Sequence, residues 1–322
     1  MGESEIKVGG VAVAPGQIAR GRIQVEVGTA AGVEMPVVVV NGSRPGPTVC
    51  ITGGVHGAEY PGIEAAIRLS RSLKPEVVCG AVIIIPIVSV PAFQRRAIYV
   101  NPMDGVNINR VFPGNPAGTI TEVMAATLFR EAVARSDAFI DLHGGDLVEA
   151  LVPFTIYYES GNAAVDEASR RMAEVYGIKY ILRSMAIRGG SYQAAAAMGK
   201  PAILTESGGQ GILDEPSVQI HIRGVTNVLK HLGVLEGYPE AAEPPVHFSH
   251  SSWLAAEQGG IFYPAVTVGQ KVEKGQVVGE FRDWFGEPIA KVVSPAEGIV
   301  LFLVTSPAIN KDDPILAVGI LD

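Results

Sequence analysis

The sequence predicts an α/β protein in which helices cover both faces of a sheet, followed by a small all-β domain. From about residue 36 to residue 233, short runs rich in valine and isoleucine alternate with helical patterns. Several of these runs are apolar throughout, as expected for strands buried on both faces of a sheet. After residue 233 comes a stretch rich in Gly, Pro, Ala and Glu, and only short β runs follow it.

The predicted strands and helices alternate along the first region. We expect Thr121 to cap the second helix, and Pro216 lies in the first turn of the last helix, where proline is common. The expected strands are 36–40, 48–52, 81–88, 138–142, 151–158, 179–182 and 202–205. The expected helices are 62–73, 121–134, 163–176, 191–198 and 215–232.

The flanking regions have no helical pattern of useful length. The C-terminal part offers β runs at 266–268, 277–281, 289–293, 299–304 and 315–320. The first 35 residues also look β-like, and we expect them to pack on the edge of the main sheet or against the C-terminal domain. The predicted division is therefore an N-terminal β segment (1–35), an α/β domain (36–233), a linker (234–246) and a β domain (247–322).

Composition excludes several classes of protein. The chain has 322 residues, of which 48% are hydrophobic and 18% charged, with a mean hydropathy of +0.28. These values exclude a mostly disordered chain. The most apolar stretch, 81–93, is interrupted by Pro86, Ser89 and Pro91 and falls short of the ~20 residues that span a bilayer. A net charge of −8 without a Lys/Arg cluster argues against nucleic acid and membrane partners. With two cysteines and no secretory signal, we expect a cytoplasmic protein.

The first segment with chemical content runs from Ile51 to Gly62. A β run ends, two glycines turn the chain, and His56 and Glu59 follow just before a helix. At the carboxyl end of a strand these side chains lie where α/β sheets bind ligands. Imidazole and carboxylate are both common ligands of catalytic zinc. The spacing alone is weak, since His56 could equally cap a turn while Glu59 is solvated.

A second strand ends in the same way and favours the metal-ligand interpretation over the turn-capping one. The run from Ala138 to Leu142 leads into His143 and two glycines. A catalytic zinc site needs three protein ligands and one open position. His56, Glu59 and His143 would supply two imidazoles and a carboxylate from two strand ends, whereas a core histidine would not need the glycine turns.

A third strand, ending at Thr205, delivers Glu206 to the same edge of the sheet. A carboxylate within hydrogen-bond reach of a metal-activated water can take its proton as the water attacks a carbonyl. Glu206 is therefore our candidate general base and later proton donor. The alternative is a helix-capping or ion-paired glutamate.

The fourth segment, 101–114, is a polar loop in a largely apolar chain. It contains an Asp-Gly turn, the pair Asn109 and Arg110, and a Phe-Pro-Gly stop. A guanidinium fork beside an amide suits bidentate binding of a substrate carboxylate. The alternative is a structural loop with a surface arginine.

Together the four segments resemble the succinylglutamate desuccinylase/aspartoacylase family of zinc-carboxypeptidase-like deacylases. The matching motifs are Gly-Gly-Val-His-Gly-x-Glu, Asp-Gly-x-Asn-x-Asn-Arg-x-Phe-Pro-Gly, Asp-Leu-His-Gly-Gly and Thr-Glu-Ser-Gly-Gly, which together extend over residues ~36 to ~233. The resemblance implies a zinc-carboxypeptidase-like mixed sheet and one Zn²⁺ per chain, held by His56, Glu59 and His143. It also implies catalysis by Glu206 and binding of the substrate carboxylate by Asn109 and Arg110. The branch that deacetylates N-acetylated diamino acids is the most similar.

The chain departs from the family pattern at two positions. Relatives often carry an aspartate at the position of Asn107, where it orients a metal-binding histidine. The amide oxygen of Asn107 can still accept the imidazole N–H. Relatives also carry an arginine that polarises the scissile carbonyl, and Tyr99 stands in its place. Either Tyr99 binds the substrate carbonyl, or Arg95 or Arg96 reaches in from a shifted position; we favour Arg96 as the catalytic contact.

The C-terminal region is similar to barrel-sandwich hybrid domains of the biotinyl/lipoyl type. The similarity rests on two glycine-punctuated segments, 268–279 and 293–300. Such domains present a lysine on the turn between these halves, but the turn here (283–288) has none, and Lys291 lies within a strand pattern. We therefore expect a structural role. His247 and His250 form an HxxH pattern, but no third ligand lies nearby in the sequence.

The leading hypothesis is a zinc-dependent hydrolase that cleaves the amide bond of a small N-acyl amino acid. Its expected partner is that small-molecule substrate, and the sequence leaves a homo-oligomer open. The alternatives are a carboxypeptidase or esterase that uses the same site, and a non-catalytic binding or carrier protein.

Overall fold

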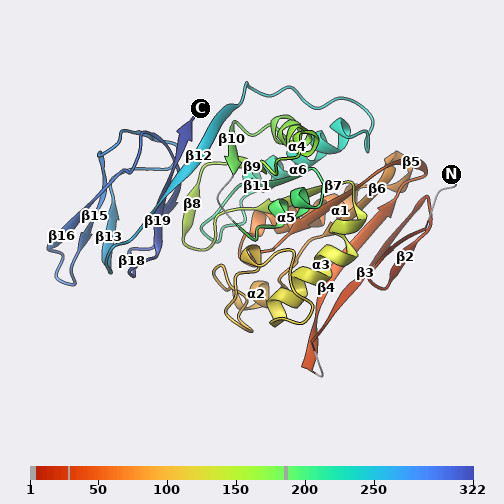
Figure 1. The fold of residues 1–322 in the computed structure, drawn as a ribbon, viewed down its shortest axis with the longest axis horizontal. Coiled ribbons are helices and arrows are strands. Elements are labelled where there is room, and N and C mark those ends of the chain that lie inside the picture. Colours follow the sequence, from red (N-terminus) through yellow and green to blue (C-terminus); the bar gives the residue numbers. More distant parts are fainter. Residues whose placement is uncertain (1–4, 28–29, 185–187) are drawn as a thin grey trace.

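A computed structural model of the chain describes residues 5–27, 30–184 and 188–322 (Figure 1). Helices cover both faces of one large mixed sheet, and a C-terminal β region extends from one end of that sheet. This architecture confirms the predicted fold class. None of the described helices is long and apolar enough to cross a membrane.

The large sheet has 13 strands among the described residues. Parallel pairing joins its central strands, from β6 through β5 and β7 to β11, so their carboxyl ends lie at one edge. In order across the sheet the strands are β14 (Lys271–Val272), β17 (Gly298–Val304), β19 (Pro314–Leu321), β12 (Val246–Ala255), β10 (Tyr180–Ser184), β9 (Phe154–Tyr158), β11 (Ala202–Glu206), β7 (Ala138–His143), β5 (Arg44–Gly53), β6 (Cys79–Ile85), β4 (Ala30–Asn41) and β3 (Gln17–Val27), with β8 (Glu149–Leu151) paired to β17.

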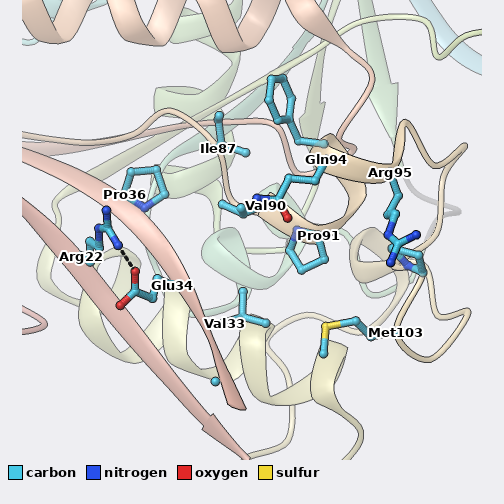
Figure 2. Close-up of a pocket in the computed structure, with 13 residues that line it drawn as sticks. Arg22, Val33, Glu34, Pro36, Ile87, Val90, Pro91, Gln94, Arg95 and Met103 are labelled. Carbon is cyan, nitrogen blue, oxygen red and sulfur yellow. Dashed lines mark hydrogen bonds and ion pairs between the residues drawn. The ribbon is translucent and has the colours of Figure 1, made fainter.

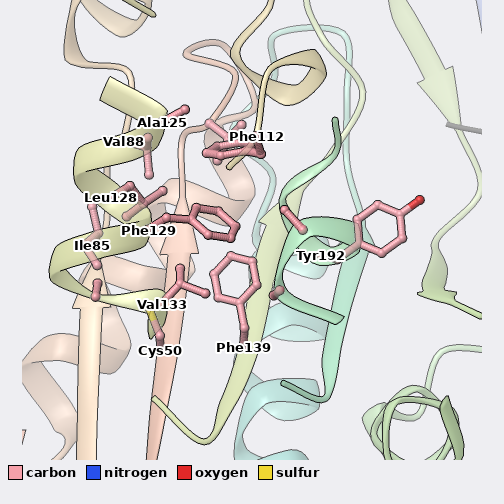
Figure 3. Packing of buried hydrophobic residues seen from close by; sticks show 14 of the residues in the cluster. Cys50, Ile85, Val88, Phe112, Ala125, Leu128, Phe129, Val133, Phe139 and Tyr192 are labelled. Atoms are coloured by element: carbon pink, nitrogen blue, oxygen red, sulfur yellow. The ribbon is translucent and has the colours of Figure 1, made fainter. Parts of the chain in front are cut away.

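Two hydrophobic cores lie on opposite faces of this sheet, which explains the continuously apolar strands. Along β5, for example, Cys50 belongs to one core while its neighbours Val49 and Ile51 belong to the other. The first core packs under α3 (Ile120–Glu131) and α5 (Ser191–Ala197), as Figure 3 shows. The second packs under α1 (Tyr60–Ser72), α4 (Ala163–Tyr176) and α6 (Glu215–His231).

The helix start signals are partly confirmed. Pro216 lies in the first turn of α6, whose N-cap is Asp214. The cap predicted at Thr121 is wrong, because Thr119 caps α3. The Thr119 hydroxyl accepts from the backbone N–H of Glu122, and the Glu122 carboxylate accepts from that of Thr119. This reciprocal pair satisfies two N–H groups that the helix leaves without partners. The short helices are α2 (Val90–Arg95), η1 (Pro75–Val77), η2 (Ile108–Arg110) and η3 (Val133–Arg135).

Two strand predictions need correction. The single strand expected at 151–158 is two strands, β8 and β9, separated by Val152 and Pro153. Because proline has no backbone N–H to donate, the chain changes partners there: β8 pairs with β17, and β9 with β10 and β11. The run 266–268 is irregular rather than a strand, and a turn begins at Val268.

The C-terminal region consists of the strands β14, β17, β19 and β12 and a second, four-stranded sheet. A third hydrophobic core lies between them. The second sheet contains β16 (Pro288–Val293), β15 (Val277–Arg282), β13 (Gly260–Pro264) and β18 (Ala308–Ile309). Its β15–β16 turn carries exposed Trp284 and Phe285. The resemblance to barrel-sandwich hybrid domains stays a prediction, as does the division into domains.

At the other end of the molecule, β3 forms the edge of the large sheet. The two-stranded sheet of β1 (Ile6–Val8) and β2 (Val11–Val13) lies beside it (Figure 1).

Candidate active site

Three strand ends bring the predicted site residues to one edge of the large sheet. β5 ends at Gly53, just before the turn that carries His56 and Glu59, while β7 ends at His143 and β11 at Glu206. His143 and Glu206 are partners in the parallel register of β7 and β11, so they lie side by side. Glu59 occupies the N-cap position of α1. The strand-then-turn pattern in the sequence thus corresponds to a real convergence in space.

His56, Glu59 and His143 form a buried group of potential metal ligands. One donor atom from each lies within 4.8 Å of the others. The Nδ1 atom of His56 is 2.8 Å from Oε1 of Glu59, and Nδ1 of His143 is 2.9 Å from Oε2 of Glu59. All three side chains are buried.

The chemistry of this group fits a cation better than a set of hydrogen bonds. Oε2 of Glu59 is buried and has no hydrogen-bond partner, although Nδ1 of His143 lies close to it. Two nitrogens and one carboxylate converge at this point, and they are a ligand set that zinc accepts. These residues could hold a metal ion.

Outer acceptors fix the orientation of both imidazoles. Nε2 of His56 lies 3.1 Å from Oδ1 of Asn107, and Nε2 of His143 lies 3.0 Å from Oδ2 of Asp141. Each ring therefore turns Nδ1 toward Glu59 and holds its other nitrogen against an oxygen, as metal-binding histidines do. The structure thus brings Asn107 to the position where the sequence analysis expects it.

Asp141 is a site residue that the sequence analysis did not assign. Its carboxylate accepts hydrogen bonds from the hydroxyls of Thr52 (2.6 Å) and Ser191, and Asp141 is fully buried. The signal was present, because residues two apart in a strand project to the same face and Asp141 precedes His143 by two.

The charges of the group perturb one another. Burial alone would raise the pKa of Glu59, but the imidazoles of His143 and His56 outweigh it and lower that pKa to about 2. Burial would lower the pKa of His143, but the carboxylates of Glu59 and Asp141 outweigh it and hold that pKa well above its usual range. Without a metal ion, the group therefore favours an ionised Glu59 beside a protonated His143.

Glu206 has the opposite electrostatic environment. Burial and the nearby Glu59 carboxylate raise the pKa of Glu206 well above its usual value. Its Oε2 atom is buried and has no hydrogen-bond partner. A carboxyl group poised to hold a proton, with one oxygen uncommitted, suits a general acid and base.

His56, Glu59, His143 and Glu206 line a cavity of about 480 Å³. Asn109 and Arg110 line it as well. Asn109 is buried and its side-chain oxygen accepts from the backbone N–H of Ser191 (2.9 Å), whereas Arg110 is exposed and donates to the carbonyl of Asn109 (2.8 Å). The Arg110 guanidinium thus keeps most of its N–H groups available.

The two candidates for polarising the substrate carbonyl lie differently. Tyr99 lines the cavity, but its single O–H donates to Oε1 of Glu149 (2.5 Å), so the phenol has no second proton for a carbonyl. Arg96 is exposed at the end of α2 and is not among the residues that line the cavity. Arg95 lines a separate open groove of about 1000 Å³ between the β3–β4 strands and α2 (Figure 2). The structure therefore brings neither arginine into the site.

The remaining predicted candidates lie apart from this group. His247 is 3.9 Å from the carboxylate of Glu174, and His250, which borders the cavity, contacts the hydroxyl of Ser249 (3.0 Å). Within the described part of the chain, the His56, Glu59 and His143 group is the only such cluster of potential ligands.

Sequence reasoning missed much of the cavity lining. Glu149 and Tyr192 face it, and the Tyr192 ring points away from the core around Phe129 and Phe139 (Figure 3). The C-terminal region supplies further lining residues: His250, Ser251, Trp253, Leu301, Phe302, Pro314 and Ala317. No local motif marks these residues, because only long-range strand pairing brings them here.

Comparisons with known proteins agree with this geometry. A sequence model of the succinylglutamate desuccinylase/aspartoacylase catalytic domain matches residues 45–232. The N-alpha-acetyl-L-2,4-diaminobutyric acid deacetylase of Halomonas elongata is 33% identical over 297 residues, which are 89% of this chain and 86% of that protein. The structure of a succinylglutamate desuccinylase/aspartoacylase from Rhodobacter sphaeroides has a TM-score of 0.86 at 30% identity, covering 95% of both chains. The product-bound ectoine utilization protein EutE (DoeB) from Ruegeria pomeroyi has a TM-score of 0.87 at 28% identity, covering 94% of this chain and 95% of that one.

Fold, site and relatives together define an α/β amidohydrolase of the deacylase class. The chain belongs to the succinylglutamate desuccinylase/aspartoacylase family. The resemblance drawn from the four motifs is thereby confirmed.

Proposed function

We propose that this protein is a zinc-dependent deacylase that hydrolyses the amide bond of a small N-acyl amino acid. One observation carries the proposal: a buried His-Glu-His ligand group lies beside Glu206, whose buried oxygen has no partner, in a single cavity. The relative from Halomonas elongata, named as a deacetylase of an N-acetylated amino acid, supports it.

His56, Glu59 and His143 would hold one zinc ion per chain. The bound ion would supply Lewis-acid polarisation of the amide carbonyl and a water nucleophile at neutral pH. Asp141 and Asn107 keep the two imidazoles in place through their Nε2 atoms. Zinc is the metal of this proposal because nitrogen and carboxylate ligands with an open position are typical of its catalytic sites.

Glu206 would move the proton. As a carboxylate it accepts the proton of the attacking water, and its raised pKa allows it to keep that proton until the amine leaves. Arg110 and Asn109 would bind the substrate carboxylate, since the Arg110 guanidinium faces the cavity with most of its donors free. The products would be a free amine and a carboxylate. We also propose a cytoplasmic enzyme, a proposal that the free thiols of Cys50 and Cys79 support.

The substitution Glu206→Gln tests the proposal. It keeps the shape of the side chain but removes the proton acceptor, so kcat should fall roughly 10²- to 10⁴-fold. The zinc content should not change. Turnover of N-acetyl, N-formyl and N-succinyl amino acids is measured beside that of a dipeptide and an ester, and zinc is measured by elemental analysis.

Glu257→Gln, at an exposed glutamate of the C-terminal region, is the matched control and should behave as the unmodified protein. Unchanged turnover in Glu206→Gln would remove the mechanism. Faster cleavage of the dipeptide or the ester would instead make the protein a carboxypeptidase or an esterase.

A further inference from the structure

The turn between β15 and β16, residues 283–288, presents two aromatic side chains to solvent. Trp284 is 80% exposed and Phe285 is 91% exposed. Hydrogen bonds hold the turn in one shape. The Asp283 carboxylate accepts from the backbone N–H groups of Phe285 (2.9 Å) and Glu287 (2.9 Å), and the backbone N–H of Asp283 donates to the Glu287 carbonyl (3.0 Å). Large aromatic side chains exposed together on an ordered turn are typical of protein–protein contacts.

An open groove of about 1000 Å³ lies between the β3–β4 strands and α2 (Figure 2). Apolar side chains form most of its lining, and Val33, Val90, Pro91 and Met103 lie around it in the figure. Met103 is 52% exposed. The groove therefore offers an apolar surface that a pair of aromatic rings could cover.

The charges of the turn and of the groove are complementary. Both charged residues of the turn, Asp283 and Glu287, are acidic, and Glu287 is exposed. In the groove Arg22 pairs with Glu34, which leaves the exposed guanidinium of Arg95. The ion pairs of the described residues include neither Arg95 nor Glu287. The acidic turn therefore fits this groove better than a second acidic turn, because like charges in contact are costly.

The turn and the groove of one chain are too far apart to meet. Six strands of the large sheet lie between β12, in the C-terminal region, and β4, which borders the groove. Neighbouring strands are ~4.8 Å apart. Figure 1 accordingly shows β15 and β16 at one end of the molecule and the β3–β4 strands toward the other. A groove that this turn could fill therefore belongs to another molecule.

The area that such a contact buries indicates that two copies exchange their turns. A buried Trp or Phe covers roughly 150–250 Å², so one seated turn and the groove wall facing it would bury roughly 600–1000 Å² in total. This area falls below the ~1200 Å² that specific, stable interfaces bury. Two such contacts in one dimer would bury roughly 1200–2000 Å², which is the usual range.

We propose that the protein is a homodimer in which the turn 283–288 of each copy occupies the groove between β3–β4 and α2 of the other copy. Trp284 and Phe285 cover the apolar lining, and Glu287 pairs with Arg95 across the contact. A two-fold exchange closes on itself, whereas turns inserted in one direction only would link copies into open chains. The proposal is independent of the proposed function, because the described residues of the turn and of the groove do not line the catalytic cavity.

Sedimentation of the full chain over a range of concentrations tests the proposal. The unmodified protein should be a dimer that dissociates on dilution. Trp284→Ser combined with Phe285→Ser removes both aromatic side chains and should weaken dimerisation roughly 100-fold or more. Tyr238→Ser, at an aromatic residue that is 90% exposed outside the turn and the groove, is the matched control and should remain dimeric. A monomeric unmodified protein, or a double variant that dimerises normally, would overturn the proposal.

A charge exchange identifies the groove as the surface that receives the turn. Arg95→Glu places like charges together and should weaken dimerisation roughly tenfold, and so should Glu287→Arg. The two changes combined in one chain restore opposite charges and should recover most of the affinity. Both side chains are exposed, so the circular dichroism spectrum should not change. Normal dimerisation of Arg95→Glu, or a combined variant no stronger than either single variant, would show that the turn binds elsewhere and would overturn the proposal.

Discussion

The two walls of the cavity are built in different ways. One wall carries His56, Glu59, His143 and Glu206, which lie at or just after the ends of parallel strands, close in sequence to glycines. Donor atoms of the first three lie within 4.8 Å of one another. The other wall carries Glu149 on β8, a three-residue strand that pairs with β17, about 150 positions further along the chain. Long-range strand pairing assembles both walls, but each residue of the first follows a strand end and turn that the sequence marks, whereas no local pattern marks Glu149.

This difference separates chemistry from recognition. The metal-binding wall is a closed set in which each imidazole is held by Glu59 on one side and by an outer oxygen on the other. The cavity is also lined by the Glu149 carboxylate and the Arg110 guanidinium, which make no ion pair within the described residues. Changes on the first wall should therefore affect every substrate, and changes on the second should affect some substrates more than others.

The largest expected effect is on the metal-binding wall. Asp141→Asn replaces the carboxylate that holds His143 with a neutral amide, and we expect metal affinity to fall roughly 10- to 100-fold. Competition with a chelator for zinc measures it. Thr52→Val removes one hydrogen bond to Asp141 but leaves the charge of Asp141, so metal affinity should fall less than in Asp141→Asn. An unchanged affinity in Asp141→Asn would mean that the outer oxygen does not support the metal ligand.

A glycine tests how firmly the recognition wall is held. In Gly209→Ala, the added methyl would meet the backbone of Glu149, so β8 must shift, at a cost of roughly 1–3 kcal/mol in unfolding free energy. Urea unfolding measures this cost. Gly10→Ala is the control, because its Cβ would meet nothing within 4 Å. Equal stability of the two variants would show that the backbone around Glu149 adapts freely.

Glu59 and Glu149 should contribute to the pH dependence of stability with opposite signs in zinc-free protein. The pKa of Glu59 is lowered to about 2, so its contribution to stability is present above its unfolded pKa of 4.5 and is lost as the pH falls toward 2. The pKa of Glu149 is raised to about 7, so stability is lost as the pH rises from 4.5 through 7.

Glu149→Gln isolates the second of these effects. We compare the stability of the variant with that of the unmodified protein at two pH values. The variant should be relatively more stable at about pH 8 than at about pH 5, by about 1–2 kcal/mol for a partly exposed group. Urea unfolding in the presence of a chelator measures it. The same difference at both pH values would contradict the raised pKa.

The smallest expected effect lies away from both walls. Thr119→Ala removes the cap of α3 and should lower the unfolding free energy by about 1 kcal/mol. The kcat/KM should not change, since Thr119 does not line the cavity. A loss of activity would show that α3 positions the site.

The sequence predicted the local features of the fold and the site well. Strands β5, β7 and β11 were predictable because continuous Val/Ile runs are typical of strands between two cores, and the His and Glu residues at their ends follow recognisable turns. The cap of α3 was misplaced by two residues, since both Thr119 and Thr121 precede an apolar run and only the partner Glu122 distinguishes them.

Features that depend on distant parts of the chain were not predictable. Nothing near β8 in the sequence points to β17, so the expected strand at 151–158 hid both the break at Pro153 and the position of Glu149. Arg96, the left-handed residue that ends α2, does not line the cavity, so its expected role stays a prediction without support from its position. The spacing of residues along the chain does not show where the side chain at such a helix end lies.

The ladder from β9 through β10 and β12 to β19 passes without interruption from the catalytic half into the C-terminal region. Backbone hydrogen bonds of this kind resist shear, so rotation of the two halves about the segment that joins them would have to break paired strands. We therefore expect access for substrate and escape of products to involve loops and side chains at the rim rather than rotation of the halves. In family members that keep this ladder, selectivity can evolve by exchanging rim residues without loosening the catalytic frame.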